Sequence, residues 1–518
     1  MIHRRTLCTL LAAAPAALIM AQAPWAKLYW SPEDLAVTNP VQVEEAHNGD
    51  LVLLSRVSDH PDERLRFIRL DAEGALLNAV DIHAPGIFFP YALVELTDGR
   101  WMAGGTGTGA YNDGFIMVLG PMGDLLTLYG LPTNATGNVF SLLARSDTTA
   151  LASFWSYHGT DMRSAFAVIH PDSLALTATA LILPDRRTDV RTSSRCADGG
   201  AYHSGWTIGT VPEHEMYLAR TDSTGAVQWA RRLITGGHGS TVTGIAEMPD
   251  GGAMLGGTYF PVLGESRPFI LRTSATGLPL WAYYLVDTVP PSATWDLYEA
   301  VLLSPDTFLL AGHGDSGSGI RMAVDTNGTL LFADRSDGTA LQDMHLAANG
   351  DVLHGLRAGS PFGTGTAQGL LRTDDDLAVA PCIHPPLDFA AVPITLAVDT
   401  LYSTAMFTLT CQDLTALFTQ TSPPLTTTDA CFTTPVGPVE GRMGPRVWPV
   451  PAHDRCTVEG PGIREAWLVD PMGRAVRSVR RRSSPSRVEF GLDGLPAGIY
   501  QLRVLSDAGW TTHAVMKE

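Results

Sequence analysis

The chain has 518 residues, of which only 17% are charged, and its formal net charge is −18 at pH 7. This length exceeds what one hydrophobic core usually supports, so two or three domains are expected. An acidic chain of this kind is a poor partner for a nucleic-acid backbone, which excludes nucleic-acid binding from the expected functions.

The first 23 residues have the pattern of a secretory signal peptide. His3-Arg4-Arg5 precedes an apolar run over residues 7–20, and Ala21-Gln22-Ala23 forms a small-residue cleavage site. No later segment is apolar over the roughly 18 residues that a membrane helix needs, so no transmembrane segment is expected. The sequence therefore predicts export, with the protein secreted or held at the cell surface.

Seven copies of one segment of about fifty residues follow. The clearest copies contain Asp71-Ala72-Glu73-Gly74, Asp222-Ser223-Thr224-Gly225 and Asp325-Thr326-Asn327-Gly328, and the equivalent position recurs at 71, 120, 171, 222, 274, 325 and 374. A second turn signal, typified by Asn48-Gly49 and Asp98-Gly99, keeps the same period. Four short apolar, β-branched runs lie between these turns in each copy, which is typical of a β-propeller blade. We therefore expect an all-β fold with a seven-bladed β-propeller over residues 24–381.

The segment 24–29 indicates how the ring would close. It resembles the fourth-strand segments 227–233 and 280–285, yet it precedes the first copy of the repeat. We expect this N-terminal strand to complete the last blade, because joining the first and last blades removes an exposed sheet edge.

The longer loops of the blades are expected to share one face of the ring, where function usually concentrates. Aromatic side chains beside carboxylates and histidine could stack on a sugar or hold a peptide there. The alternative is that most of these aromatic residues pack between blades. The candidate ligand-binding residues are Tyr91, Trp155, Tyr157, Trp206, Glu213, His214, Glu215 and Trp295.

No catalytic residue, cofactor or metal ligand is predicted, since HExxH, GxSxG and Walker patterns are absent. The triplet Glu213-His214-Glu215 could bind a metal, but neighbouring strand positions point to opposite faces. It is therefore grouped with the ligand-binding candidates.

Residues 382–440 leave the repeat and become rich in Thr, Pro and Ser. Alternation over 392–398 and 405–409 indicates a few strands, and the remainder is typical of a linker. One disulfide among Cys382, Cys411 and Cys431 is expected in an oxidising compartment, with Cys456 as a further candidate partner. The interpretation is a small disulfide-bearing β module followed by a Thr/Pro-rich linker.

Residues 441–518 contain four elements in a characteristic order. They are Pro449-Val450-Pro451, Asp470-Pro471-Met472-Gly473-Arg474, Leu495-Pro496-Ala497-Gly498-Ile499-Tyr500, and an end that carries Lys517. This order resembles the C-terminal sorting domain of type IX secretion cargo in Bacteroidota. The resemblance implies a small Ig-like β-sandwich that the type IX secretion machinery recognises, with Pro449, Pro451, Gly473, Gly498, Tyr500 and Lys517 as motif residues.

Three classes of function remain open. The favoured one is a surface or secreted binding protein whose propeller holds an unknown glycan, peptide or protein. The second is a secreted hydrolase that acts on glycans through loop carboxylates, which paired acids facing the central channel would favour. The third is a structural or adhesive surface component. Fold alone cannot decide between them.

Overall fold

A computed structural model of the protein describes most of the chain between residues 25 and 517. The described ranges are 25–31, 36–59, 62–83, 86–108, 114–131, 137–158, 161–173, 175–209, 214–262, 264–287, 295–314, 319–336, 339–359, 366–373, 387, 389–429, 446–448, 453–460, 463–469, 475–480, 487–496, 498–506 and 509–517. Among these residues, no helix has the length and hydrophobicity to cross a membrane.

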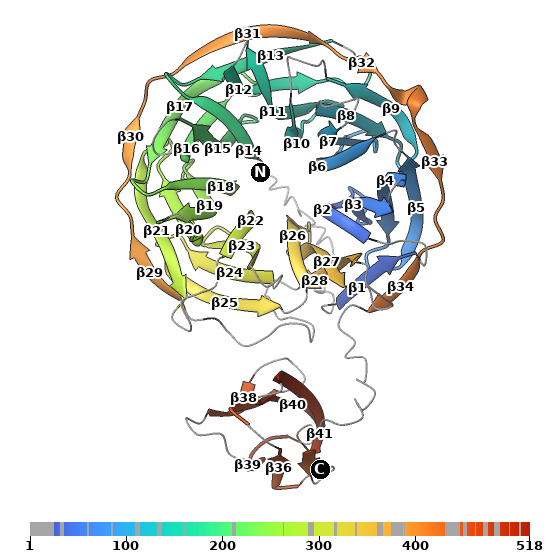
Figure 1. The fold of residues 1–518 in the computed structure, drawn as a ribbon, viewed down its shortest axis with the longest axis vertical. Helices are drawn as coiled ribbons and strands as arrows, with labels where there is room; N and C mark the ends of the chain where they lie inside the picture. The colour runs from blue at the N-terminus through green and yellow to red at the C-terminus, as the bar shows by residue number, and fades with distance from the viewer. Residues whose placement is uncertain are drawn as a thin grey trace, which may run out of the picture.

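The described residues up to 429 form seven antiparallel sheets arranged as a propeller-like ring (Figure 1). The inner three or four strands of each sheet are consecutive in the chain, and the first of them lies nearest the centre of the ring. In chain order the strands are β2 (Ala36–Glu45), β3 (Leu51–Asp59), β4 (Asp62–Leu70) and β5 (Leu76–His83); β6 (Ile87–Glu95), β7 (Trp101–Thr108), β8 (Gly114–Leu119) and β9 (Leu125–Gly130); β10 (Val139–Ala144), β11 (Ala150–His158), β12 (Asp161–Ile169) and β13 (Ala175–Ile182); β14 (Arg187–Arg195), β15 (Ala201–Ile208), β16 (His214–Thr221) and β17 (Val227–Ile234); β18 (Gly239–Glu247), β19 (Ala253–Phe260), β20 (Arg267–Thr273) and β21 (Pro279–Asp287); β22 (Trp295–Ser304), β23 (Thr307–Gly314), β24 (Gly319–Asp325) and β25 (Leu330–Ser336); and β26 (Thr339–Leu346), β27 (Val352–Gly359) and β28 (Thr366–Thr373).

The repeated Asp-x-x-Gly signal makes the turn between the third and fourth strands. Asp71 Oδ1 accepts hydrogen bonds from the backbone N–H groups of Glu73 and Ala75, at 3.0 and 2.7 Å. Asp222 and Asp325 make the equivalent pair of bonds in later copies. The glycine in this turn has a positive φ, 75° at Gly74, which a residue with a Cβ adopts only with strain. The period of the sequence is thus a period of side-chain-capped turns.

The central strands are buried on both faces because each sheet packs between two neighbours. All six residues of β8 are buried, and so are all seven of β20. One hydrophobic cluster joins Phe67 of the first sheet to Trp101 and Phe115 of the second, and similar clusters lie between other neighbouring sheets. The middle of each of these strands therefore appears in the sequence as a continuous apolar run, as in Phe115–Leu119 and Phe269–Leu271.

The last sheet is completed by the N-terminal strand β1 (Trp25–Trp30). β1 pairs antiparallel with β28, from Trp25 opposite Arg372 to Tyr29 opposite Gln368. The first and last sheets are thereby joined through hydrogen bonds between distant parts of the chain, and β28 is not left as an open edge.

Residues 389–429 run around the outside of the ring instead of forming a separate module (Figure 1). Each of six short strands adds a fifth strand to the outer edge of a different sheet, in the order of sheets five, four, three, two, one and seven. The strands are β29 (Phe389–Pro393), β30 (Ala397–Asp399), β31 (Ser403–Thr410), β32 (Gln412–Asp413), β33 (Thr419–Thr421) and β34 (Thr426–Asp429), with the 3₁₀-helix η2 (Thr415–Leu417) between β32 and β33. At the sixth sheet, the Leu387 N–H donates to the Ala333 carbonyl of β25.

This outer belt, residues 387–429, corrects the expectation of a separate small β module, while a disulfide between Cys382 and Cys431 stays a prediction. The outermost strand of a four-stranded sheet has unpaired N–H and C=O groups along one side, and each belt strand pairs with such an edge rather than with another belt strand. Cys411 follows β31 and has a buried free thiol, whose pKa burial raises to about 11. Cys456 and Cys196 are also free and buried. Cys382 and Cys431 lie outside the described residues.

The described residues between 446 and 517 form two small antiparallel sheets. The first has the order β35 (Arg446–Trp448), β36 (Arg455–Glu459) and β39 (Arg487–Gly491), and the second has the order β38 (Ala475–Arg480), β37 (Glu465–Val469), β40 (Gly498–Ser506) and β41 (Gly509–Lys517). Side chains of both sheets share one core, which includes Val458, Phe490 and Leu502. Two sheets that cover a common core are the arrangement of a β-sandwich.

Candidate ligand site in the central cavity

A β-bulge interrupts each innermost strand at nearly the same place. In β6 the pairing with β7 skips from Pro90 to Ala92, so that Tyr91 is an extra residue without a ladder partner. The corresponding extra residues in the next five innermost strands are Phe140, Arg191, Thr243, Tyr298 and Gln342. In β2 the skip runs from Thr38 to Val41. A bulge re-aims the side chain of its extra residue, so the ring places a set of nonequivalent side chains around its axis.

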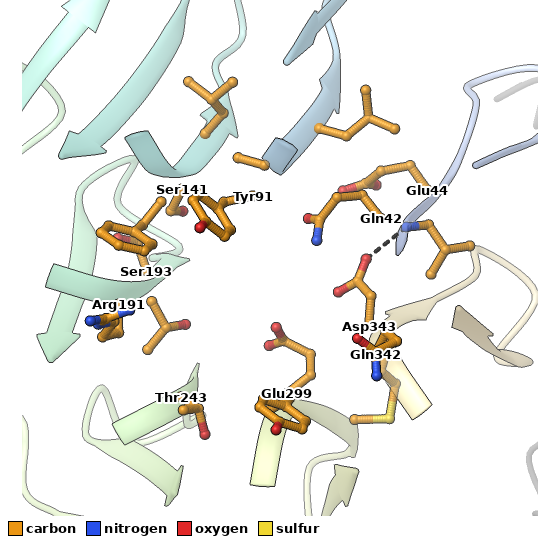
Figure 2. Close-up of a pocket in the computed structure, with 18 of the residues that line it drawn as sticks. Gln42, Glu44, Tyr91, Ser141, Arg191, Ser193, Thr243, Glu299, Gln342 and Asp343 are labelled. Carbon is orange, nitrogen blue, oxygen red and sulfur yellow. Dashed lines mark hydrogen bonds between the residues drawn. The ribbon is translucent and has the colours of Figure 1, made fainter. Parts of the chain in front are cut away.

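These residues line a cavity of about 550 Å³ at the centre of the ring (Figure 2). All seven innermost strands contribute to its wall. The aromatic lining consists of Phe89, Tyr91, Phe140 and Tyr298, and the polar lining of Gln42, Glu44, Ser141, Arg191, Thr192, Ser193, Thr243, Glu299, Gln342 and Asp343. This volume is within the range of small-molecule sites, roughly 300 to 1,000 Å³.

One wall of the cavity carries an arginine held between aromatic rings. The Arg191 guanidinium carbon lies 4.7 Å from the ring centre of Phe140 and 4.4 Å from that of Trp206. Arg191 Nη2 bonds to Asp189 Oδ2 at 2.7 Å, and Trp206 Nε1 donates to the same oxygen at 2.7 Å. Tyr91 stacks on the other ring, Phe140, at 5.1 Å. The cation is therefore oriented before any ligand arrives.

The opposite wall is acidic. Glu299 and Asp343 both project into the cavity, and Glu44 lies beside them (Figure 2). Asp343 Oδ2 accepts a hydrogen bond from Val43 N–H at 2.7 Å, and Glu299 Oε1 accepts one from Ala300 N–H at 3.1 Å. Among the described residues, no lysine or arginine pairs with either carboxylate, whereas Glu44 pairs with His345 at 2.9 Å.

Burial and mutual repulsion raise the pKa values of the carboxyl groups on this wall. Burial and the neighbouring Asp343 raise the pKa of Glu299 well above its usual range. Burial, with a further contribution from Glu44, raises the pKa of Asp343 to about 6 against the opposing hydrogen bond from Val43. Burial lowers the pKa of His345, but attraction to Glu44 outweighs it and raises the value to about 8. The two carboxyls therefore bind protons more tightly than exposed carboxyls do.

Substituting Asp343 by asparagine should stabilise the fold at pH 7.5. The pKa of Asp343 is about 6 in the folded state and about 3.9 in an unfolded chain, so the folded state binds more protons between these values and loses stability as the pH rises through them. The substitution removes this penalty, about 2 to 3 kcal/mol above pH 6 and little at pH 4, while the amide oxygen can still accept the Val43 N–H. Urea unfolding of both proteins at pH 4 and 7.5 measures the difference. Asp172→Asn, on the exposed surface, is the control, and equal effects at the two pH values would contradict the assignment.

Two of the candidate residues from the sequence lie at the cavity. Tyr91 lines it directly, and Trp206 lies behind Arg191, where its ring also stacks on His214 at 4.6 Å. Trp155 is half-buried and meets Tyr157 edge to face at 5.0 Å, and Tyr157 is 39% exposed. These two belong to β11 and are not among the residues that line the cavity.

Trp295 and Glu215, two of the remaining candidates, are buried among residues that stabilise the fold. Trp295 is buried in the hydrophobic cluster between the fifth and sixth sheets, which leaves its ring no access to a ligand. Glu215 is buried in β16 and lies 3.4 Å from Arg232 and 3.7 Å from Arg186, so its charge is already balanced. Glu213 lies outside the described residues. Among the residues that are described, no group of three His, Cys, Asp or Glu side chains is placed to hold a metal ion.

The sorting-motif residues of the described part lie on adjacent strands. Gly498 of β40 pairs with Lys517 of β41, and Tyr500 pairs with Val515. Tyr500 is buried and its hydroxyl donates to the Pro496 carbonyl at 2.8 Å, so it belongs to the core of this unit. Pro449, Pro451 and Gly473 lie outside the described residues.

Sequence reasoning missed most of the cavity residues, although a signal for them exists. The bulge residues Tyr91, Phe140, Arg191, Thr243 and Gln342 each stand seven positions before the Asp or Asn of the next turn. Tyr298 stands eight positions before Asp306, because a second bulge after Leu302 adds one residue. Their types differ from copy to copy, which hides the position from any search for a repeated residue.

Comparison with known proteins gives no family for this chain. No protein-family model matches it, and no curated protein matches it. The solved structures that resemble it include the polysaccharide lyase Uly1 (11% identity, TM-score 0.40, covering 67% of this chain and 90% of that one), a protein of unknown function from Dyadobacter fermentans (11%, 0.39, 68% and 98%) and a sialidase mutant from Streptococcus pneumoniae (8%, 0.38, 67% and 70%). At these values none of the likenesses bears on what this chain binds or does.

Proposed function

We propose that this protein is an exported binding protein, a seven-bladed β-propeller that holds a small polar ligand in its central cavity. The observation that carries the proposal is the conjunction of six single-residue bulges around one axis with a cavity of ligand size. A ring that served only as a scaffold would gain stability from apolar residues at these positions. Instead they include Arg191 and Gln342, beside the acids Glu299 and Asp343.

Donors without partners support this proposal. Within the described residues, Gln342 Nε2 and Arg191 Nε are buried N–H groups with no acceptor. A buried donor without an acceptor destabilises a fold by about 1 to 3 kcal/mol, so such groups usually have a water or ligand to bond. Both belong to residues that line the cavity.

Delivery to the cell exterior is the second part of the proposal. The signal-peptide pattern of residues 1–23 and the sorting-domain resemblance of residues 441–518 both support it, and the resemblance alone implies the type IX secretion machinery as a partner. Fusing residues 441–518 to a periplasmic reporter in a host with this machinery tests the assignment. A reporter that stays in the periplasm would refute it.

A ligand screen on the mature chain tests the cavity. Saccharides, amino acids and short peptides are added singly, and thermal unfolding is followed. Saturation at about a hundred times the dissociation constant should stabilise the native state by about 2.7 kcal/mol.

Tyr91→Ala and Gln342→Ala should abolish the shift in the unfolding midpoint, each measured against its own ligand-free midpoint, because both remove cavity contacts. Tyr157→Ala, away from the cavity, should keep it. Loss of the shift in Tyr157→Ala alone would place the ligand on the loop face instead.

A second candidate function is glycan hydrolysis, which the two acids of the cavity favour. Glu299, with its raised pKa, would donate a proton to the leaving group, and Asp343 would act as base or nucleophile. Nitrophenyl glycosides in the same screen distinguish the two functions. Turnover that disappears in both Glu299→Gln and Asp343→Asn would establish the hydrolase, and stabilisation without turnover supports the binding protein.

A further inference from the structure

The two walls of the central cavity have opposite electrical character. Arg191 lies on one side, and Glu299 and Asp343 approach from the other (Figure 2). We propose that the ligand is zwitterionic, an amino acid or a short peptide whose ammonium group binds Glu299 and Asp343 and whose carboxylate binds Arg191. This inference rests on the proposed function, because it names the ligand class of the same cavity.

Within the described part of the chain, the cation nearest the acidic wall is His345, which pairs with Glu44 and is bonded to neither Glu299 nor Asp343. Each of these two carboxyls is bonded to backbone N–H groups, and no described lysine or arginine pairs with either. A buried carboxylate without a counter-charge is strongly unfavourable, and a ligand ammonium supplies both the charge and three N–H donors. A sugar hydroxyl supplies a hydrogen bond but leaves the negative charge uncompensated.

Arg191, on the other wall, has N–H donors that Asp189 does not use. Asp189 occupies Nη2 of Arg191, and the rings of Phe140 and Trp206 hold the plane of the guanidinium. Nε has no acceptor within the described residues. A carboxylate matches the planar arrangement of the remaining donors better than a hydroxyl does, since it can accept two parallel N–H bonds.

Binding of an ammonium group should release protons. The ammonium charge would stabilise the ionised forms of Glu299 and Asp343, which repel each other and are also repelled by Glu44 of β2. The other groups that face them are the His345 cation of β26, the neutral Tyr298 hydroxyl and, across the cavity, Arg191. The bound state therefore holds fewer protons than the free state. Affinity should therefore rise as the pH increases from 5 to 7.5.

The test compares blocked and free ligands on the mature chain. Each standard amino acid and its glycyl dipeptide is screened by thermal shift, and the best binder is titrated calorimetrically beside its N-acetyl and C-terminal amide forms. We expect each blocked form to bind at least about tenfold more weakly, and the free form to bind more tightly at pH 7.5 than at pH 5.

Matched variants separate the two ends of the ligand. Glu299→Gln should weaken the free and amide forms and leave the N-acetyl form unchanged, whereas Arg191→Met should weaken the free and N-acetyl forms. Tyr157→Ala is the control for both. Equal binding of the free and N-acetyl forms would overturn the inference. Stabilisation by a neutral saccharide and by no zwitterion would also overturn it while keeping the cavity as a ligand site, and no stabilisation by either class would contradict the proposed function as well.

Discussion

Replacing Tyr29 by alanine is expected to lower the free energy of unfolding of the ring by about 3 to 5 kcal/mol. Tyr29 is fully buried in β1, where it packs between Leu53 and Ile68 of the first sheet and Leu353 and Leu370 of the last. Its hydroxyl donates to the Gly74 carbonyl at 2.8 Å. The alanine variant leaves a cavity where the N-terminal strand packs against the first sheet, and chemical denaturation measures the loss of stability.

Tyr29→Phe is the matched control for this site. It keeps the ring and removes only the hydroxyl, so its effect should be about 1 kcal/mol. If the alanine variant lost no more stability than the phenylalanine variant, closure of the ring would not depend on this strand.

Replacing Asp81 by alanine should lower the free energy of unfolding by a similar amount, for an electrostatic reason. Arg66 is fully buried, and its Nε and Nη2 atoms bond to the two Asp81 oxygens at 2.7 and 2.8 Å, while Arg64 Nε reaches the same carboxylate at 2.8 Å. Asp81→Ala removes a counter-charge that both guanidinium groups share, and breaking a buried ion pair on one side typically destabilises a fold by about 3 to 5 kcal/mol. Urea unfolding of the variant measures the effect.

Two further variants show whether loss of the Asp81 charge causes this destabilisation. In Arg66→Met with Asp81→Leu, two of the three charged groups are replaced by apolar side chains of similar size while Arg64 keeps its charge, so part of the stability should return. Asp172→Ala removes a carboxylate that is 78% exposed and pairs with Arg100 at 2.8 Å, and it should change stability by less than about 1 kcal/mol. A double variant as unstable as Asp81→Ala would show that packing, not charge, dominates here.

Local features of this fold could be predicted from the sequence because each depends on a few neighbouring residues. The Asp-x-x-Gly turns follow from the hydrogen bonds that Asp71 makes to residues two and four positions later. The fifty-residue period follows from the repetition of those turns, and four apolar runs per period indicate four strands. The strand at 24–29 could be placed beside the last repeat because its sequence resembles a fourth strand, and β1 does pair with β28.

The outer belt could not be predicted from the same kind of pattern. Its strands were visible as short alternating runs, yet their partners are outer strands such as β13 and β5, hundreds of residues away in the chain. Pairing there is determined by which sheet edges remain open after the ring has formed. A count of turns and apolar runs contains no information about those edges, so the sequence pattern predicts a separate module instead.

The sequence by itself determined an all-β chain of seven repeats with a closing N-terminal strand, because turn chemistry and strand periodicity act over a few residues. Only the tertiary structure decided which side chains meet at the axis. Arg191, Glu299 and Asp343 belong to different repeats and come together because the bulges in β14, β22 and β26 face one cavity. The tertiary structure likewise decided that Trp295 is buried and that Trp206 orients an arginine. Burial and long-range contact depend on how the sheets pack around the ring, and the sequence of any single repeat does not contain that packing.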